Sequence, residues 1–360
     1  MHWRPLLTAV PPRIPGLMTA LELKVPKAAR GRIDAIDELK GVAILLIILY
    51  HAGGVLVWQN TLHGDIGVDL FVVISGIGLA LSSRVETAAA FLRRRLIRIF
   101  PAYWIVLTTF LLANTHFLQH RYTRFNIILH FLGIHAWFGD FFAFSIDDSF
   151  WFITLIVCLY LMYAFLRPAL TRPDHIVLLG GAISFAVAYV YFLAGQGGCF
   201  SHIGLRLPAF FAGLIIGALL REGHVEIRLS PALAAGLVLL TYVPYTRGFM
   251  FYSEIPAFAL AMAYVFLWRE MAPAVLVAPT ARFLQVFGKY SLEIFLLHQP
   301  LIREYNYYLH ARLLNEANPS VFSVIFGMAI GLGVAVLLSV ELHKLLDRIG
   351  AYLGRAKEAR

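Results

Sequence analysis

Charged residues are scarce in this sequence: they make up 14% of its 360 residues, whereas a soluble domain carries about 25%. Hydrophobic residues reach 60%, and the mean hydropathy is +0.75. Soluble domains built from this composition would lack the polar side chains that must cover their surface, and a disordered chain requires low hydrophobicity. The composition therefore excludes both classes and indicates an integral membrane protein, in which the excess apolar surface faces lipid.

Cysteine is scarce as well. The two cysteines, Cys158 and Cys199, match no metal-binding or redox spacing. The histidines also lack a pair at ligand spacing on one helix face beside a carboxylate, since His130 and His135 lie five residues apart. The sequence therefore predicts no metal centre.

Negative charge is rarer than positive charge, because 21 Asp and Glu face 30 Lys and Arg and give a net charge of +9 at pH 7. In a soluble protein such an excess would favour nucleic-acid binding. In a membrane protein Lys and Arg accumulate in cytoplasmic loops, where they orient the helices. We therefore expect the lipid bilayer as a partner and no nucleic acid, while the oligomeric state stays open.

Long hydrophobic runs dominate the rest of the chain. A spanning helix needs about 20 largely apolar residues. Ten stretches of this kind occur, at 41–58, 66–82, 99–116, 150–166, 175–194, 206–220, 231–246, 255–269, 283–301 and 321–343. They predict an all-α integral membrane protein with a single bundle of about ten transmembrane helices.

A shorter apolar stretch at 125–137 decides the topology. If it does not cross the membrane, most Lys and Arg fall on the cytoplasmic side, as the positive-inside rule requires. If it crosses, the basic segments from Arg167 onward fall on mixed sides. We therefore expect 125–137 to lie along or dip into the outer face, and both termini to be cytoplasmic.

Three segments follow from this topology. Residues 1–32 are basic, are interrupted by proline and lack the apolar core of a cleaved signal, so they are expected to form a cytoplasmic tail. Residues 33–343 form the polytopic domain, with short loops and no repeat of fixed period. Residues 344–360 form a second basic cytoplasmic tail.

Lys40 and His51 are the first candidates for chemistry, because ionisable groups inside spans are costly and are often functional. Eleven residues separate them, about three helical turns or about 16 Å, so both side chains share one face of the first span. Histidine suits a general base because its ordinary pKa lies near neutral pH. The alternative is a buried histidine that is hydrogen-bonded to a neighbouring helix.

Arg95 and Arg98 belong to a run of arginines before the third span. Three residues apart, they share a face if that turn is helical, and paired guanidinium groups can bind a phosphorylated ligand through bidentate hydrogen bonds. A topology signal or a lipid head-group contact explains the same cluster.

Asp69 and His298 are placed at the outer ends of the second and ninth spans. Asp69 could orient a histidine from there. Ser75, Gly76 and Gly78 follow it, and such small residues favour close helix packing.

These segments occur in an order that resembles the acyltransferase family 3 membrane proteins, whose first helix carries an arginine, ten residues and a histidine. Residues 36–51 resemble that helix, residues 67–76 the second-helix motif, and residues 95–101 the cytoplasmic arginine motif. Three later parts of the sequence also resemble motifs of the family: Trp151 with Tyr160, residues 207–213 and residues 290–300. Two positions differ from the family pattern, since Lys40 stands where the family has arginine and residues 151–156 lack a common glutamate.

The resemblance implies an O-acyltransferase of the bacterial inner membrane that moves an acyl group, usually acetyl, from cytoplasmic acetyl-CoA to a hydroxyl of a cell-surface or lipid-linked glycan. It implies that His51 is the catalytic base, and that Asp69 and His298 orient the base or the acceptor. Arg95 and Arg98 would hold the phosphates of the donor, with support from Lys40. Substrate-binding roles fall to Tyr290, Ser291 and Trp151.

Two other functions fit the composition. A transporter or flippase without acyl chemistry would also have ten spans and polar residues inside them, although the inverted repeats and paired broken helices of many transporters are missing from the sequence. A membrane scaffold without activity is the third possibility. Transfer of label from acetyl-CoA to a glycan distinguishes the enzyme from both.

Overall fold

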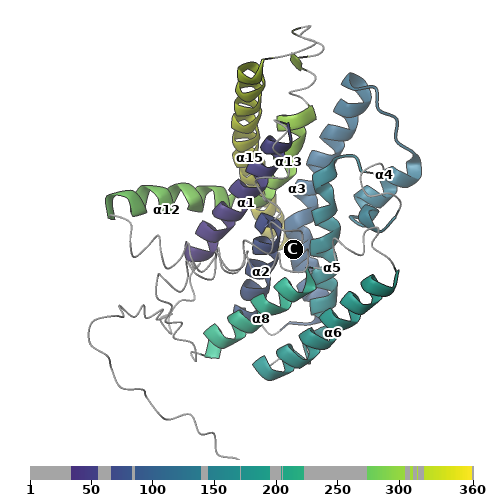
Figure 1. The fold of residues 1–360 in the computed structure, drawn as a ribbon, viewed down its shortest axis with the longest axis vertical. Helices are drawn as coiled ribbons and strands as arrows, with labels where there is room; N and C mark the ends of the chain where they lie inside the picture. The colour runs from purple at the N-terminus through teal and green to yellow at the C-terminus, as the bar shows by residue number, and fades with distance from the viewer. Residues whose placement is uncertain are drawn as a thin grey trace, which may run out of the picture.

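The fold is all-helical in the part of the chain that the structure describes, and no strand occurs there (Figure 1). The structure is a computed structural model. It describes residues 34–55, 66–82, 86–138, 145–170, 172–194, 204, 206–222, 274–304, 309–310, 314 and 320–358. The predicted spans at 231–246 and 255–269 and the predicted tail at 1–32 lie outside these residues.

Ten α-helices form the described part. They are α1 (Asp34–Val55), α2 (Ile66–Leu81), α3 (Ala88–Phe117), α4 (Arg124–Phe131), α5 (Trp151–Leu166), α6 (Pro173–Ala194), α8 (Leu207–Glu222), α12 (Ala274–Lys289), α13 (Ser291–Gln299) and α15 (Val321–Glu358). Three segments are long and apolar enough to cross a membrane: Ala88–Phe117, Asp148–Leu166 and Val321–Tyr352. Large apolar side chains such as Phe165 and Phe322 are 73% and 79% exposed, as expected of surfaces that face lipid.

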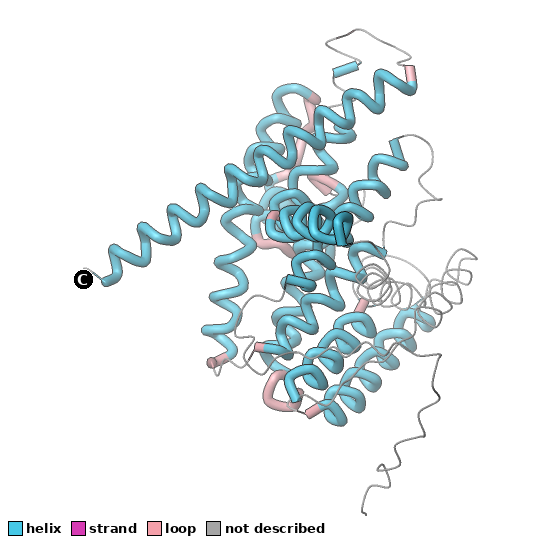
Figure 2. The backbone as a smooth tube through the Cα atoms, turned by 90° about the vertical axis from the view of Figure 1, so that its left-hand side faces the viewer, coloured by secondary structure: helices cyan, strands magenta, loops and turns pink. Residues whose placement is uncertain are grey.

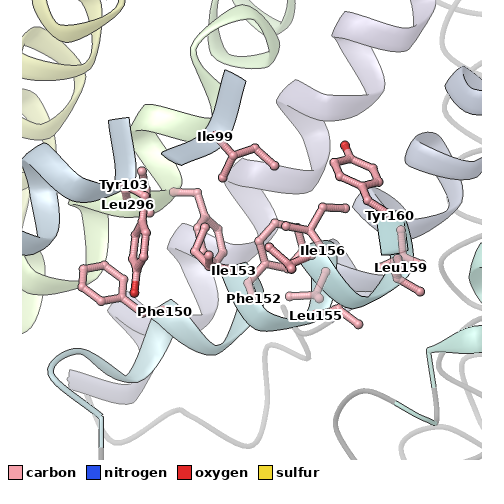
Figure 3. Packing of buried hydrophobic residues seen from close by; sticks show 14 of the residues in the cluster. Ile99, Tyr103, Phe150, Phe152, Ile153, Leu155, Ile156, Leu159, Tyr160 and Leu296 are labelled. Carbon is pink, nitrogen blue, oxygen red and sulfur yellow. The ribbon is translucent and has the colours of Figure 1, made fainter. Parts of the chain in front are cut away.

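The core lies where α3, α5 and α13 meet (Figure 3). Tyr103 of α3 and Leu296 of α13 are fully buried, and the ring of Tyr103 packs edge-on against Phe150 at 5.4 Å between centroids. Ile153 and Leu155 of α5 complete the layer with no exposed surface. This core connects the helix that carries the arginine run to the helix that carries His298.

Glycine lets two helix pairs approach at backbone distance. A Cβ atom at Gly213 of α8 would overlap the carbonyl oxygen of Val73 in α2, and one at Gly76 would overlap that of Phe210. The same holds for α1 and α12, where a Cβ at Gly41 would overlap the carbonyl of Leu284. The predicted packing role is thus confirmed for Gly76, whereas a Cβ at Gly78 meets nothing within 4 Å among the described residues.

The segment at 125–137 is too short to cross a membrane. Helix α4 has eight residues, about 12 Å against about 30 Å of hydrocarbon. It ends at Gly133, which has a φ of +69°, with hydrogen bonds from Gly133 N to His130 O and from Ile134 N to Leu129 O. These bonds form a Schellman motif. The chain turns back there into the 3₁₀ helix η1 (His135–Trp137).

Two indole groups fix this turned segment against the bundle. Trp104 of α3 donates its Nε1 hydrogen to the carbonyl of Phe131 at 2.8 Å. Trp137 donates to the sulfur of Cys158 in α5 at 3.2 Å. The expectation that this stretch does not span agrees with the structure.

The predicted ninth span, 283–301, is divided at Tyr290. Helix α12 lies across the other helices in Figure 1, whereas α13 runs along the bundle. A five-residue π-helical turn, η5 (Pro300–Glu304), follows α13. In Figure 2 the last helix, α15, extends far beyond the bundle at its carboxyl end, so the predicted C-terminal tail continues this helix as far as residue 358.

Candidate active site

Two histidines meet between α1 and α13. The ring centroids of His51 and His298 lie 5.1 Å apart, which brings together two of the predicted catalytic residues from distant parts of the chain. His298 is fully buried, and its Nδ1 lies 2.7 Å from the carbonyl oxygen of Phe295. Because a carbonyl can only accept, Nδ1 carries the hydrogen and the neutral ring keeps its lone pair on Nε2. That Nε2 has no hydrogen-bond partner among the described residues.

Aromatic side chains hold His298 in place. The ring of Phe295 lies 5.6 Å from the ring of His298 and 4.8 Å from that of Phe152 in α5. Phe152 in turn contacts Phe71 of α2 at 6.1 Å. Four helices therefore contribute to the surroundings of the histidine pair, which is half-buried on the His51 side.

An ion pair joins the two segments that flank this site. Arg303 in the π-helical turn donates to Asp148 at 2.7 Å, and Asp148 begins the short 3₁₀ helix η2 (Asp148–Phe150) ahead of α5. π-Helical turns inside helices occur frequently at functional sites. Neither residue stands out in the sequence, because the contact joins segments more than 150 residues apart.

Asp69 pairs with Arg206. The carboxylate of Asp69 is fully buried in the first turn of α2, and its Oδ1 lies 3.3 Å from Nε of Arg206, which precedes α8. The guanidinium of Arg206 also lies over the ring of Trp151 at 4.9 Å. The structure thus joins a predicted catalytic residue and a predicted substrate-binding residue through Arg206, which the sequence analysis did not select.

Lys40 occupies the opposite end of α1 from His51. Its Nζ lies 3.4 Å from Asp37, one turn earlier, and its side chain keeps 27% exposure. The neighbouring Glu38 accepts a hydrogen bond of 2.9 Å from Gln285 of α12. Lys40 therefore lies on a turn of α1 that is fixed against α12.

The arginine run is helical, and its members have different surroundings. Arg95 lies over the rings of Phe91 and Tyr160, at 5.6 and 5.4 Å, whereas Arg98 is exposed. Arg94 forms an ion pair with Glu86. The expected Arg95–Arg98 pair therefore consists of one anchored guanidinium group and one that faces outward.

Tyr290 and Ser291 lie at the other end of α13 from the histidine pair, since eight residues or about 12 Å of helix separate Tyr290 from His298. The ring of Tyr290 contacts His343 of α15 edge-on at 5.1 Å. His343 Nδ1 lies 2.7 Å from the buried carboxylate of Glu293. This carboxylate–imidazole pair was not predicted from the sequence, because its two residues lie on separate helices.

His130 and His135 stack at 3.8 Å in the turned segment, and both are buried. His130 uses both ring nitrogens, since Nδ1 lies 2.9 Å from the carbonyl of Asn126 and Nε2 accepts from the amide of Ile146 at 3.1 Å. Burial lowers the pKa of His130 to about 4 and that of His135 to about 2. Both are therefore neutral near pH 7. Within the described residues no three His, Cys, Asp or Glu side chains are grouped so as to hold a metal ion.

These features define a multi-pass helical membrane protein in which a contact between His51 and the buried His298 lies at one end and the arginine run of α3 at the other. Comparison with known proteins extends this description. Residues 33–340 match the acyltransferase domain that defines acyltransferase family 3, so the chain belongs to that family.

One relative is BcsY of Komagataeibacter xylinus, which is named provisionally as a membrane-bound transacylase. It is 42% identical over 76 residues, and the match covers 20% of this chain and 18% of that protein. No solved structure matches the chain.

Proposed function

We propose that this acyltransferase moves an acetyl group from cytoplasmic acetyl-CoA to a hydroxyl of a cell-surface or lipid-linked glycan. The observation that carries the proposal is the contact between His51 and His298, because it sets a half-buried nitrogen base, His51, against a fully buried second histidine within the bundle. His51 takes the proton of the acceptor hydroxyl, and the hydroxyl oxygen bonds to the thioester carbonyl carbon. The carbon–sulfur bond then breaks, and the CoA thiolate leaves and takes up a proton.

His298 is proposed as the residue that positions His51. The Phe295 carbonyl fixes the tautomer of His298, so its Nε2 faces its surroundings as a hydrogen-bond acceptor. This nitrogen has no partner among the described residues, so the proposed role requires the His51 ring to rotate and donate one ring N–H to it, which leaves the other His51 nitrogen as the base. Asp69 is proposed to act indirectly on the acceptor, because its carboxylate holds Arg206 over the ring of Trp151 at the outer face.

The end of the bundle that carries Arg95 and Arg98 of α3 is proposed as the binding site for the acyl donor. Arg95 is anchored on two aromatic rings, and Arg98 is exposed one turn further along α3. Guanidinium groups match phosphate oxygens through parallel hydrogen bonds. Lys40 contributes a further cation on α1. No metal ion takes part in this scheme.

The topology belongs to the same proposal. The contacts of Asp69 with Arg206 and of Arg206 with Trp151 place the amino ends of α2, α8 and α5 together. Their carboxyl ends meet where Arg167 and Arg221 lie. Helices α2, α5 and α8 therefore run in the same direction, as the second, fourth and sixth spans of the predicted topology should. Together with the positive-inside rule, this common direction supports ten spans, with the polytopic domain at 33–343 and the cytoplasmic tails at 1–32 and 344–360. The membrane is proposed to be the bacterial inner membrane.

Acetyl-CoA carrying a labelled acetyl group tests the donor. We expect label to pass from the cytoplasmic side to glycan in membranes that contain the protein, and not in membranes that lack it. Movement of glycan across the membrane without label would overturn the proposal in favour of a transporter. Mass spectrometry of surface glycans from cells with and without the protein then identifies the acceptor by the loss of an acetyl group.

A further inference from the structure

A carboxylate lies among the arginines at the cytoplasmic end of the bundle. Glu86 precedes α3 and pairs with Arg94, whose Nε donates to Oε2 at 3.2 Å while Nη2 bonds to Oε1. Arg167, just after α5, approaches the same carboxylate at 3.9 Å and donates to the backbone carbonyl of Glu86 at 3.3 Å. The Glu86 side chain keeps 16% exposure, so most of the carboxylate is enclosed.

Two more guanidinium groups border this pair. Arg95 lies on the rings of Phe91 and Tyr160, and its Nε is buried without a hydrogen-bond acceptor in the part of the chain that the structure describes. Arg221 of α8 donates to the carbonyl of Ala80 at the end of α2, at 3.2 Å. Tyr163 lies between them, because its ring contacts that of Phe91 at 5.3 Å and its hydroxyl donates to the carbonyl of Leu79, next to Ala80, at 3.4 Å. The five groups therefore share one site.

The chemistry of this site favours an anion with more charge and more acceptors than one carboxylate. A carboxylate offers two oxygens and one negative charge. A phosphate monoester offers three oxygens and a charge of about −1.5 to −2 at pH 7, and it binds arginine in the same bidentate geometry. A phosphate group that enters the site can therefore replace Glu86 on Arg94 and Arg167, and it also provides an acceptor for Arg95.

We propose that Glu86 is an internal counter-ion that occupies the arginine site until a phosphate-bearing donor displaces it. Glu86 thereby sets the affinity of the site and its preference for polyanionic donors over neutral thioesters. This inference rests on the proposed function for the identity of the donor. It adds Glu86, Arg167 and Arg221 to the residues that the sequence analysis selected for donor binding.

Neutralising Glu86 should tighten anion binding. Removing a like charge about 5 Å from a phosphate at an effective dielectric constant of about 20 strengthens binding by a factor of about 10² before screening, and salt together with solvation of the displaced carboxylate reduces this to about ten-fold. Replacing Arg167 removes a ligand for the phosphate and should weaken binding by a similar factor. Both effects should decrease as the salt concentration rises.

Calorimetric titration of the full-length protein in nanodiscs tests the inference, with adenosine 3′,5′-bisphosphate and inorganic pyrophosphate as probes. We expect Glu86→Gln to lower the dissociation constants about ten-fold and Arg167→Ala to raise them about ten-fold. Arg172→Ala is the matched control, because Arg172 pairs with Asp174 in an arrangement that is 68% and 53% exposed. It should bind like the unaltered protein.

The inference is overturned if Glu86→Gln binds the probes equally well or more weakly while its thermal unfolding matches that of the unaltered protein. Glu86 would then order the arginines instead of competing with the ligand. If Glu86→Gln does not fold, Glu86→Asp provides the test, because its shorter side chain should loosen the pair with Arg94 and tighten probe binding. Unchanged or weaker binding by a folded Glu86→Asp would then overturn the inference.

Acetyl transfer separates this inference from the proposed function. If Glu86→Gln binds the probes more tightly but the unaltered protein transfers no acetyl group, the counter-ion role of Glu86 stands and the proposed function is refuted. Acetyl transfer with the same KM for acetyl-CoA in Glu86→Gln and the unaltered protein would retain the function and refute the counter-ion.

Discussion

The ion pair between Asp69 and Arg206 yields a quantitative test of how the amino ends of α2 and α8 are held together. Asp69 is fully buried and the side chain of Arg206 keeps 12% exposure, with 3.3 Å between Oδ1 and Nε. Removing one member of a buried pair typically costs about 3–5 kcal/mol, because the other charge stays in a poorly solvated place. We expect Asp69→Asn and Arg206→Gln each to lower the free energy of unfolding by about that amount.

The double variant separates the pair from its surroundings. Asp69→Asn combined with Arg206→Gln leaves neither charge buried, so its loss should be smaller than the sum of the single losses by about 0.5–3 kcal/mol. Arg206 lies over Trp151, so tryptophan fluorescence reports on this region during unfolding in mixed micelles. The exposed pair of Arg172 and Asp174 is the control, and the same exchange there should leave unfolding unchanged.

Additive losses in this cycle would refute the reasoning. They would mean that the two side chains stabilise the protein independently of each other. Small single losses would refute it too, because they would show that solvent reaches the pair despite the burial of Asp69.

Two further predictions concern the helix contact between α2 and α8 and the turned segment. Gly213→Val should destabilise the protein strongly, because its Cβ would overlap the carbonyl of Val73, whereas Gly78→Ala should leave the thermal unfolding temperature unchanged, since nothing described lies within 4 Å of its Cβ. His130 and His135 have lowered pKa values, so the unfolded chain binds protons below about pH 6.5 that the folded chain does not bind. Stability should be full above that pH and fall towards pH 4 by about 1.4 kcal/mol per pH unit for each histidine. His135→Phe should remove its share of this slope in unfolding titrations, and an unchanged slope would contradict the assignment.

Hydropathy located the described helices well because every helix that crosses lipid needs a run of largely apolar residues. It placed α3 poorly, starting it at residue 99, whereas the helix begins at Ala88. The arginines resembled a boundary, but Thr87 caps the helix by accepting from the amide of Ala90 at 3.2 Å, and Glu86 neutralises part of the charge. Local hydrophobicity contains no information about such partners.

The sequence predicted those residues of the candidate site that belong to a recognisable motif. His51 and His298 were selected and do meet in the structure. Arg206, Glu86 and Glu293 were missed because their importance comes from contacts between distant helices. The break at Tyr290 was missed for a similar reason, since residues 283–301 are continuously apolar enough to be taken for one span.

The transfer activity of His51→Ala tests directly whether His51 is the catalytic base. His116→Ala provides a matched control, because His116 lies exposed in the last turn of α3. Both variants and the unaltered protein are reconstituted in proteoliposomes with labelled acetyl-CoA, and their thermal unfolding is compared. We expect His51→Ala to fold but to lose about 10²–10⁴-fold in transfer rate, and His116→Ala to keep its activity. Full transfer by a folded His51→Ala would contradict this expectation.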